Sequence, residues 1–230
     1  MKDEVVSYSI NGHDAQGYLV IPESYSPERA SASRGGVVVI QEWCGLNDNI
    51  KDITRRVAEL GYVAIAPDLY NGQVAKEPDE AQKLRMEIEL GEAVKKISAA
   101  AKYLKQDHGV SKVACMGFCM GGTLTILAST TGEFVAAVPF YGRIVDEIKL
   151  GLDKIKIPVL GFYGTQDHGI PVESVEGFKK ELDQRGVVNE FHFYSAGHAF
   201  FNDTRPESYN EQASKDAWEK VKRWFKKYLE

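Results

Sequence analysis

Cysteine is scarce in this sequence, and long hydrophobic runs are missing from it. Three cysteines, Cys44, Cys115 and Cys119, occur among 230 residues, an odd number in a chain long enough to fold without covalent links. We therefore expect free thiols rather than a disulfide framework. No stretch approaches the roughly 18 apolar residues of a membrane-spanning helix, and the first ten residues lack the pattern of a secretory signal. These absences predict a cytoplasmic protein with no membrane contact.

An excess of positive charge is also missing. The chain has 28 lysines and arginines against 33 aspartates and glutamates, which gives a formal net charge of −5. This balance provides no electrostatic footprint for nucleic acid or for an anionic membrane, so we expect a small-molecule partner. Hydrophobic residues make up 43% of the chain, enough at this length for one large core. With no internal repeat or low-complexity tract, residues 1–230 are expected to form a single domain.

Strand and helix patterns alternate along the chain. Two short β-rich runs separated by Asn11-Gly12 predict an opening hairpin, and the apolar run Val37–Ile40 is typical of a buried parallel strand. Residues 47–60 follow with helical spacing of apolar side chains, and 71–91 is an irregular, charged segment that could cap a site. The alternation predicts an α/β fold with a mostly parallel central sheet flanked by helices. Further strands are expected at 62–66, 113–118, 136–141, 158–163 and 191–194.

The sharpest motif is Gly117-Phe118-Cys119-Met120-Gly121-Gly122, which lies between an apolar strand and a helix carrying Leu124 and Ile126. A strand-turn-helix of this form places a nucleophile at the tip of a tight turn, and the flanking positions need residues without bulky side chains. The backbone N–H of Met120 would then lie at a helix N-terminus, where the dipole favours an anion. We predict that Cys119 attacks as a thiolate.

Asp167 and His198 follow this turn in the chain order that nucleophile-acid-base triads of this type require. Each comes shortly after a predicted strand, which places both at the carboxyl edge of the sheet, where such folds bind ligands. We predict that His198 is the base and that Asp167 orients it. His168 is a weaker candidate for the base, and Asp146 and Asp153 are weaker candidates for the acid because no strand end precedes them.

Cys115 precedes Cys119 by four residues, a spacing that leaves open a redox pair or a metal site. This spacing matches no standard zinc pattern, and the strand before a tight turn is usually buried. We therefore predict that Cys115 packs in the core. A thiol redox or binding protein that hydrolyses nothing is the alternative from another class.

Together these segments resemble the dienelactone hydrolase (carboxymethylenebutenolidase) family over nearly the whole chain. The motifs that carry the resemblance are Gln41-Glu42, Pro67-Asp68-Leu69-Tyr70, the turn around Cys119, the Asp167 loop and Gly197-His198-Ala199-Phe200. The resemblance implies an α/β-hydrolase fold, a monomer and no cofactor. It also implies hydrolysis of dienelactone to maleylacetate, in the bacterial breakdown of chlorinated aromatic compounds.

The resemblance implies two further roles in the site. In the family the glutamate that matches Glu42 contacts the resting thiol and helps to deprotonate it when substrate binds, which is chemistry that a carboxylate beside a thiol can perform. The backbone N–H groups of Trp43 and Met120 would form the oxyanion hole.

The residues at the positions that bind the substrate carboxylate depart from the family pattern. The family holds the substrate carboxylate with two arginines, and Asn202 occupies the position of the second, four residues beyond the histidine. No arginine stands at the expected first position, although Arg85 lies about one helical turn further on. A general carboxylesterase acting on other small esters is therefore the nearest alternative. Residues that could bind substrate instead, by charge or as an aromatic wall, are Arg85, Arg143, Arg205 and Tyr141.

Overall fold

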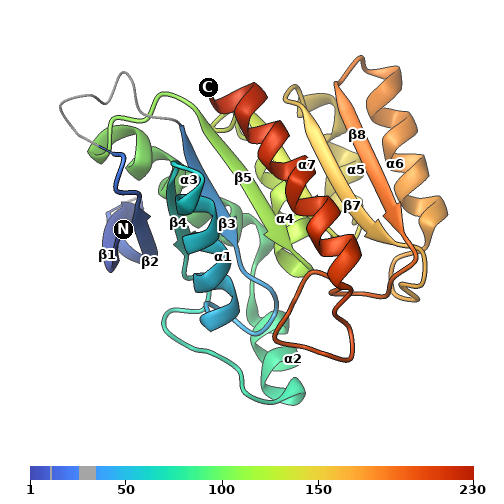
Figure 1. The fold of residues 1–230 in the computed structure, drawn as a ribbon, viewed down its shortest axis with the longest axis horizontal. Coiled ribbons are helices and arrows are strands. Elements are labelled where there is room, and N and C mark those ends of the chain that lie inside the picture. Colours follow the sequence, from blue (N-terminus) through green and yellow to red (C-terminus); the bar gives the residue numbers. More distant parts are fainter. Residues whose placement is uncertain (11, 26–34) are drawn as a thin grey trace.

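The computed structural model describes residues 1–10, 12–25 and 35–230, and the strands in these ranges form one eight-stranded sheet (Figure 1). The strand order is β1-β2-β4-β3-β5-β6-β7-β8, with the first two pairs antiparallel and the others parallel. The predicted α/β fold with an opening hairpin is confirmed, while Asn11 of the predicted turn lies outside the described residues. The strands are β1 (Lys2–Ile10), β2 (His13–Ile21), β3 (Gly36–Ile40), β4 (Val63–Pro67), β5 (Val113–Phe118), β6 (Ala136–Phe140), β7 (Val159–Gly164) and β8 (Asn189–Tyr194).

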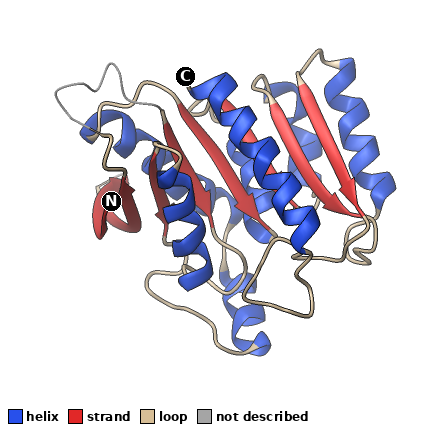
Figure 2. Cartoon of the chain, viewed as in Figure 1, coloured by secondary structure: helices blue, strands red, loops and turns tan. Residues whose placement is uncertain are grey.

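Helices cover both faces of the sheet (Figure 2). The helices α1 and α7 pack on one face, and α3, α4 and α6 pack on the other. No helix in the described part of the chain is long and apolar enough to cross a bilayer. The helices are α1 (Asp48–Glu59), α2 (Pro78–Glu87), α3 (Leu90–Asp107), α4 (Met120–Ala128), α5 (Asp146–Gly151), a 3₁₀ turn (Leu152–Lys154), α6 (Val172–Gln184) and α7 (Glu211–Leu229).

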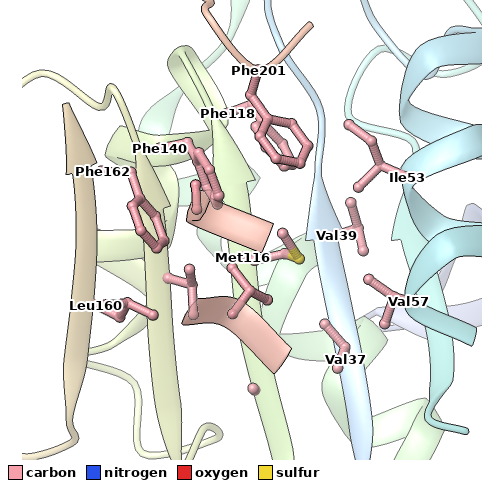
Figure 3. Close-up of a cluster of buried hydrophobic side chains, with 14 of the residues drawn as sticks. Val37, Val39, Ile53, Val57, Met116, Phe118, Phe140, Leu160, Phe162 and Phe201 are labelled. Carbon is pink, nitrogen blue, oxygen red and sulfur yellow. The ribbon is translucent and has the colours of Figure 1, made fainter. Parts of the chain in front are cut away.

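Strand periodicity divides the core into two layers. On β3, Val37 and Val39 face α1 and α7, whereas Val38 faces the layer under α3 and α4. Figure 3 shows the first layer, in which Phe118 stacks on Phe140 with ring centroids 4.7 Å apart. Burial of each such side chain contributes roughly 1.5–3 kcal/mol. Because both layers pack on the same strands, the carboxyl edge of the sheet is held rigidly.

The segment 71–91 is more regular than its sequence suggested. It contains α2, which begins with a capping box between Glu77 and Glu80 and with Pro78 in the first turn. Ala81 is its one buried residue and packs near Trp43. The expectation of an irregular segment was therefore wrong: a helix with a single buried position shows no apolar period, although its capping residues could have indicated it.

Candidate active site

The candidate residues gather at the carboxyl edge of the parallel strands. Glu42 lies just beyond β3, Cys119 directly follows β5, Asp167 lies just beyond β7, and His198 lies beyond β8. Strands that are neighbours in a parallel sheet end at the same edge, so residues far apart in the chain meet there. The structure brings the four predicted polar groups together. Asp146, by contrast, is exposed, pairs with Lys149 and lines neither cavity at Cys119.

Cys119 occupies a strained turn between β5 and α4. Its backbone has φ 55° and ψ −115°, a region that residues with a side chain rarely adopt. A Cβ atom on Gly117 would overlap the carbonyl oxygen of Gly121, and one on Gly121 would overlap that of Ile40. Strand and helix therefore approach so closely that only glycine fits at both positions. The predicted role of these glycines is confirmed.

Two backbone N–H groups belong to residues that line the cavities at Cys119. The Met120 N–H is the first of α4, so it has no intrahelical acceptor, and the Trp43 N–H lies in the loop after β3. Neither donates a hydrogen bond to another described residue. The Tyr70 hydroxyl donates to the Met120 sulfur at 3.4 Å, which fixes that side chain. Free N–H groups beside a nucleophile can bind a developing oxyanion.

His198 is held between an acid and the thiol. Its Nδ1 lies 2.6 Å from Oδ2 of Asp167, and its ring lines the same two cavities as Cys119. The other carboxylate oxygen of Asp167 accepts the Gly169 N–H at 2.9 Å, which fixes the acid. His168 lines the same cavity, but Asp167 bonds to His198 instead. The geometry thus favours His198 over His168 as the base.

The pKa values of His198 and Asp167 are shifted in opposite directions. Burial lowers the pKa of His198, but the hydrogen bond to Asp167 and the interaction with Cys119 outweigh it and raise the pKa to about 10. Burial raises the pKa of Asp167, but the hydrogen bond and charge of His198 outweigh it and the pKa is lowered. At neutral pH the site therefore holds an imidazolium between a carboxylate and the thiol.

Glu42 is buried, with 3% of its surface exposed, and is held by neutral donors. Asn202 Nδ2 donates to its Oε2 at 2.8 Å, and the Tyr141 hydroxyl donates to its Oε1 at 3.3 Å. Among the described residues no cation lies within ion-pair distance of it. Burial raises the pKa of Glu42, and the Asn202 hydrogen bond together with the charges of Arg205 and His198 only partly offsets this.

Asn202 has a structural role that the sequence did not reveal. Its Oδ1 accepts the Thr204 N–H at 3.1 Å and the Thr204 hydroxyl at 2.7 Å. These two donors settle the orientation of the amide, so its NH₂ group must face Glu42. At the position where the family has its second arginine, this chain therefore has a neutral amide, held in one orientation, that donates to Glu42. Only the folded loop after His198 shows this, because 160 residues separate Asn202 from Glu42.

Two cavities meet at Cys119. The larger, of about 670 Å³, is walled mainly by apolar side chains and contains Arg143 and Tyr141. The smaller, of about 220 Å³, contains Glu42, Trp43 and Arg205. The side chains that line both are Arg85, Cys119 and His198. All the substrate-binding candidates therefore lie around the thiol.

Cys115 lies in the core, as predicted. It is fully buried, its sulfur faces the carbonyl oxygens of Thr125 and Ala136 at 3.8 Å, and burial raises the pKa of its thiol. All three cysteines are free thiols. Across the described ranges no group of three or more His, Cys, Asp or Glu side chains could hold a metal ion.

The sequence and the fold are similar to those of known proteins. The model of the dienelactone hydrolase family matches residues 16–229. "Protein usf" of Aquifex pyrophilus is 34% identical, covering 98% of this chain and 99% of that protein. "Putative carboxymethylenebutenolidase" of Escherichia coli is 33% identical over 98% of this chain and 89% of its own length.

Solved structures agree with the sequence relatives. A Klebsiella pneumoniae protein described as a "Putative Dienelactone Hydrolase" superposes with a TM-score of 0.87 at 29% identity, covering 99% of this chain and all of the other. A dienelactone hydrolase-like promiscuous phosphotriesterase from metagenomic libraries superposes with a TM-score of 0.84 at 26% identity, covering 100% and 99%. The chain belongs to the dienelactone hydrolase family and is a hydrolase that acts on esters or lactones.

Proposed function

We propose that this hydrolase cleaves its substrate through a Cys119-His198-Asp167 triad and a thioester intermediate. The observation that carries the proposal is the 2.6 Å contact between His198 and Asp167 at a cavity that Cys119 also lines, with Cys119 at the tip of a strained turn. The imidazolium of His198 stabilises the Cys119 thiolate once the thiol has lost its proton, and Asp167 keeps the ring in the productive orientation. Glu42, close to both, is proposed to accept the thiol proton when substrate binds.

The reaction has two steps. The Cys119 sulfur attacks the carbonyl carbon, and the negative charge on the carbonyl oxygen is held by the N–H groups of Trp43 and Met120. The tetrahedral intermediate collapses, the bond to the leaving oxygen breaks, and His198 gives that oxygen a proton. His198 then removes a proton from water, the hydroxide attacks the thioester, and the carboxylic acid leaves while the sulfur takes back its electron pair. Glu42 returns its proton to the sulfur, which restores the resting thiol. No cofactor is required.

Carboxylate-bearing substrates fit this site, and dienelactone, converted to maleylacetate, is the one that the family resemblance favours. Arg85, Arg143 and Arg205 supply positive charge around the thiol. A carboxylesterase that prefers neutral esters is the second candidate, and the neutral Asn202 beside Glu42 favours it. We further propose that the enzyme acts as a cytoplasmic monomer.

Pre-steady-state kinetics with p-nitrophenyl acetate tests the thioester. We expect a burst of about one equivalent of p-nitrophenol per active site, because acylation of the thiol releases it before water attacks. Peptide mass spectrometry of acid-quenched enzyme should locate an acetyl group on Cys119. An acetyl group on another side chain, or turnover without any acyl enzyme, would contradict the proposed intermediate.

The contact between Asn202 and Glu42 predicts a shift of the pH-rate profile. Asn202→Asp places a second carboxyl group beside Glu42, and repulsion between the two raises the pKa of Glu42 further. Because Glu42 accepts a proton only when ionised, the acidic limb of kcat/KM should move to higher pH by about one unit. Asn202→Ala, which removes the donor without adding charge, is the matched comparison and should shift the limb less. An unmoved limb in Asn202→Asp would show that Glu42 takes no part.

A further inference from the structure

The cavities on the two sides of Cys119 differ in size and in the residues that line them. The larger has apolar walls from Ile88, Leu90, Met120, Val145 and Ile170, and its volume of about 670 Å³ is within the range of pockets that bind drug-sized ligands. The smaller has about 220 Å³, and charged side chains of Glu42, Arg85 and Arg205 are among the residues that line it. A compact lactone needs only one cavity. Two cavities that diverge from a nucleophile suit an open-chain ester, whose acyl and alcohol parts leave the carbonyl in different directions.

The large cavity has an unbalanced positive charge. Asp167 is the one acid in its lining, and His198 pairs with it. Arg85 and Arg143 line the cavity and have no carboxylate partner among the residues with described positions. Elsewhere, Arg185 forms an ion pair with Glu181. Guanidinium groups left unpaired beside a nucleophile are available to a ligand carboxylate, which they can bind through two parallel hydrogen bonds.

Arg143 is attached to the most constrained part of this cavity. Tyr141, just before it, has φ 37°, and its N–H donates to the Phe162 carbonyl at 2.7 Å. A Cβ on Gly142 would overlap the backbone of α4, so this strand end and the helix are in direct contact. The Thr123 hydroxyl donates to the Arg143 carbonyl at 3.1 Å. The backbone of Arg143 is therefore fixed relative to Cys119. Its side chain can then bind a charged group of the substrate only within a set distance of the thiol.

We propose that the site takes open-chain esters in which the half that fills the large cavity has an apolar body ending in a carboxylate, and that Arg143 binds this carboxylate. The inference rests on the proposed triad and departs from the proposed substrate, because it places open-chain esters with a terminal carboxylate ahead of dienelactone, which is a lactone. The apolar walls hold the body of the substrate, and Arg143 discriminates between esters that carry the terminal charge and esters that do not. This assigns to Arg143 a part in specificity rather than in bond cleavage.

Matched ester pairs test this assignment. Mono-p-nitrophenyl adipate and p-nitrophenyl hexanoate share a six-carbon acyl chain, and only the first has a terminal carboxylate. Acetate esters of 6-hydroxyhexanoic acid and of hexanol place the same difference on the alcohol side. We expect the wild-type enzyme to have a kcat/KM at least roughly tenfold higher for the charged member of one pair. Arg143→Gln should bring that ratio close to one.

Arg223 provides the control, because it is exposed on α7 and lines neither cavity. Arg223→Gln should keep the wild-type ratio in both pairs. Equal rates for the charged and neutral members of both pairs, or a preference that survives in Arg143→Gln, would overturn the inference. If acetyl-Cys119 still formed in that case, the proposed function would stand, whereas absence of the acyl enzyme would count against the proposed function itself.

Discussion

Replacing Cys119 with alanine is expected to lower kcat/KM for p-nitrophenyl acetate by about 10⁴-fold or more, because the nucleophile of a triad acts as one unit with its base and acid. No other thiol can replace it. Cys115 is fully buried, and the Cys44 thiol is nearly buried and contacts Arg205 at 3.3 Å. Residual turnover would come only from the free N–H groups and from substrate positioning. Steady-state kinetics under matched conditions measure the loss.

The fold of this variant should be preserved. Alanine removes a sulfur that is partly exposed, and it keeps the Cβ that the turn at φ 55° already accommodates. We therefore expect the circular dichroism spectrum and Tm of Cys119→Ala to remain near those of the wild type. Cys115→Ala is the comparison: it should cost some stability, since it leaves a cavity in the core, and should retain turnover. Retained ester hydrolysis in Cys119→Ala would eliminate the thiol mechanism.

The sequence predicted the elements that carry strong periodicity. The range 113–118 of β5 was predicted without error, because each of its residues is buried and the run is continuous. The helix α1 was also predicted from its apolar spacing, and the structure identifies Asn47 as its cap, because the Asn47 side chain accepts the Ile50 N–H. α2 and α5 were missed. Each buries a single residue, Ala81 in α2 and Ile148 in α5, so no apolar period marks them.

The site likewise has a part that the sequence could predict and a part that it could not. Cys119, Asp167 and His198 could be placed together from sequence because each comes at or shortly after a strand end, and parallel strands end at one edge. The Asn202-Glu42 contact could not be predicted from sequence, because it depends on how the loop beyond His198 folds back over the sheet. The same holds for the two cavities, whose walls come from side chains on several loops and helices. Local patterns identify reactive groups, whereas the surroundings of those groups require tertiary structure.

Asp167→Asn should lower kcat by roughly 10³–10⁴-fold while leaving the fold intact. The amide keeps an acceptor oxygen for the Gly169 N–H but no longer offers a charged acceptor to His198 Nδ1. His198 then loses the interaction that fixes its tautomer, and its pKa should fall from about 10 towards the ordinary value near 6.5. The imidazolium beside Cys119 is thereby lost at neutral pH. Asp153→Asn, at one of the two other acids considered, should retain activity, and a tenfold loss or less in Asp167→Asn would exclude Asp167 as the acid.

The loss of stability in Asp167→Asn should depend on pH. Because the folded pKa of His198 is raised, its contribution to the free energy of unfolding is complete below about 6.5 and is lost as the pH rises through about 10. The folded pKa of Asp167 is lowered, so its contribution is present above its unfolded pKa and is lost as the pH falls through the folded value. The Tm difference between wild type and Asp167→Asn should therefore be largest between about pH 4 and 6.5 and should shrink towards pH 10. A difference that grows above pH 7 would mean that the two groups do not form a charged pair in the folded enzyme.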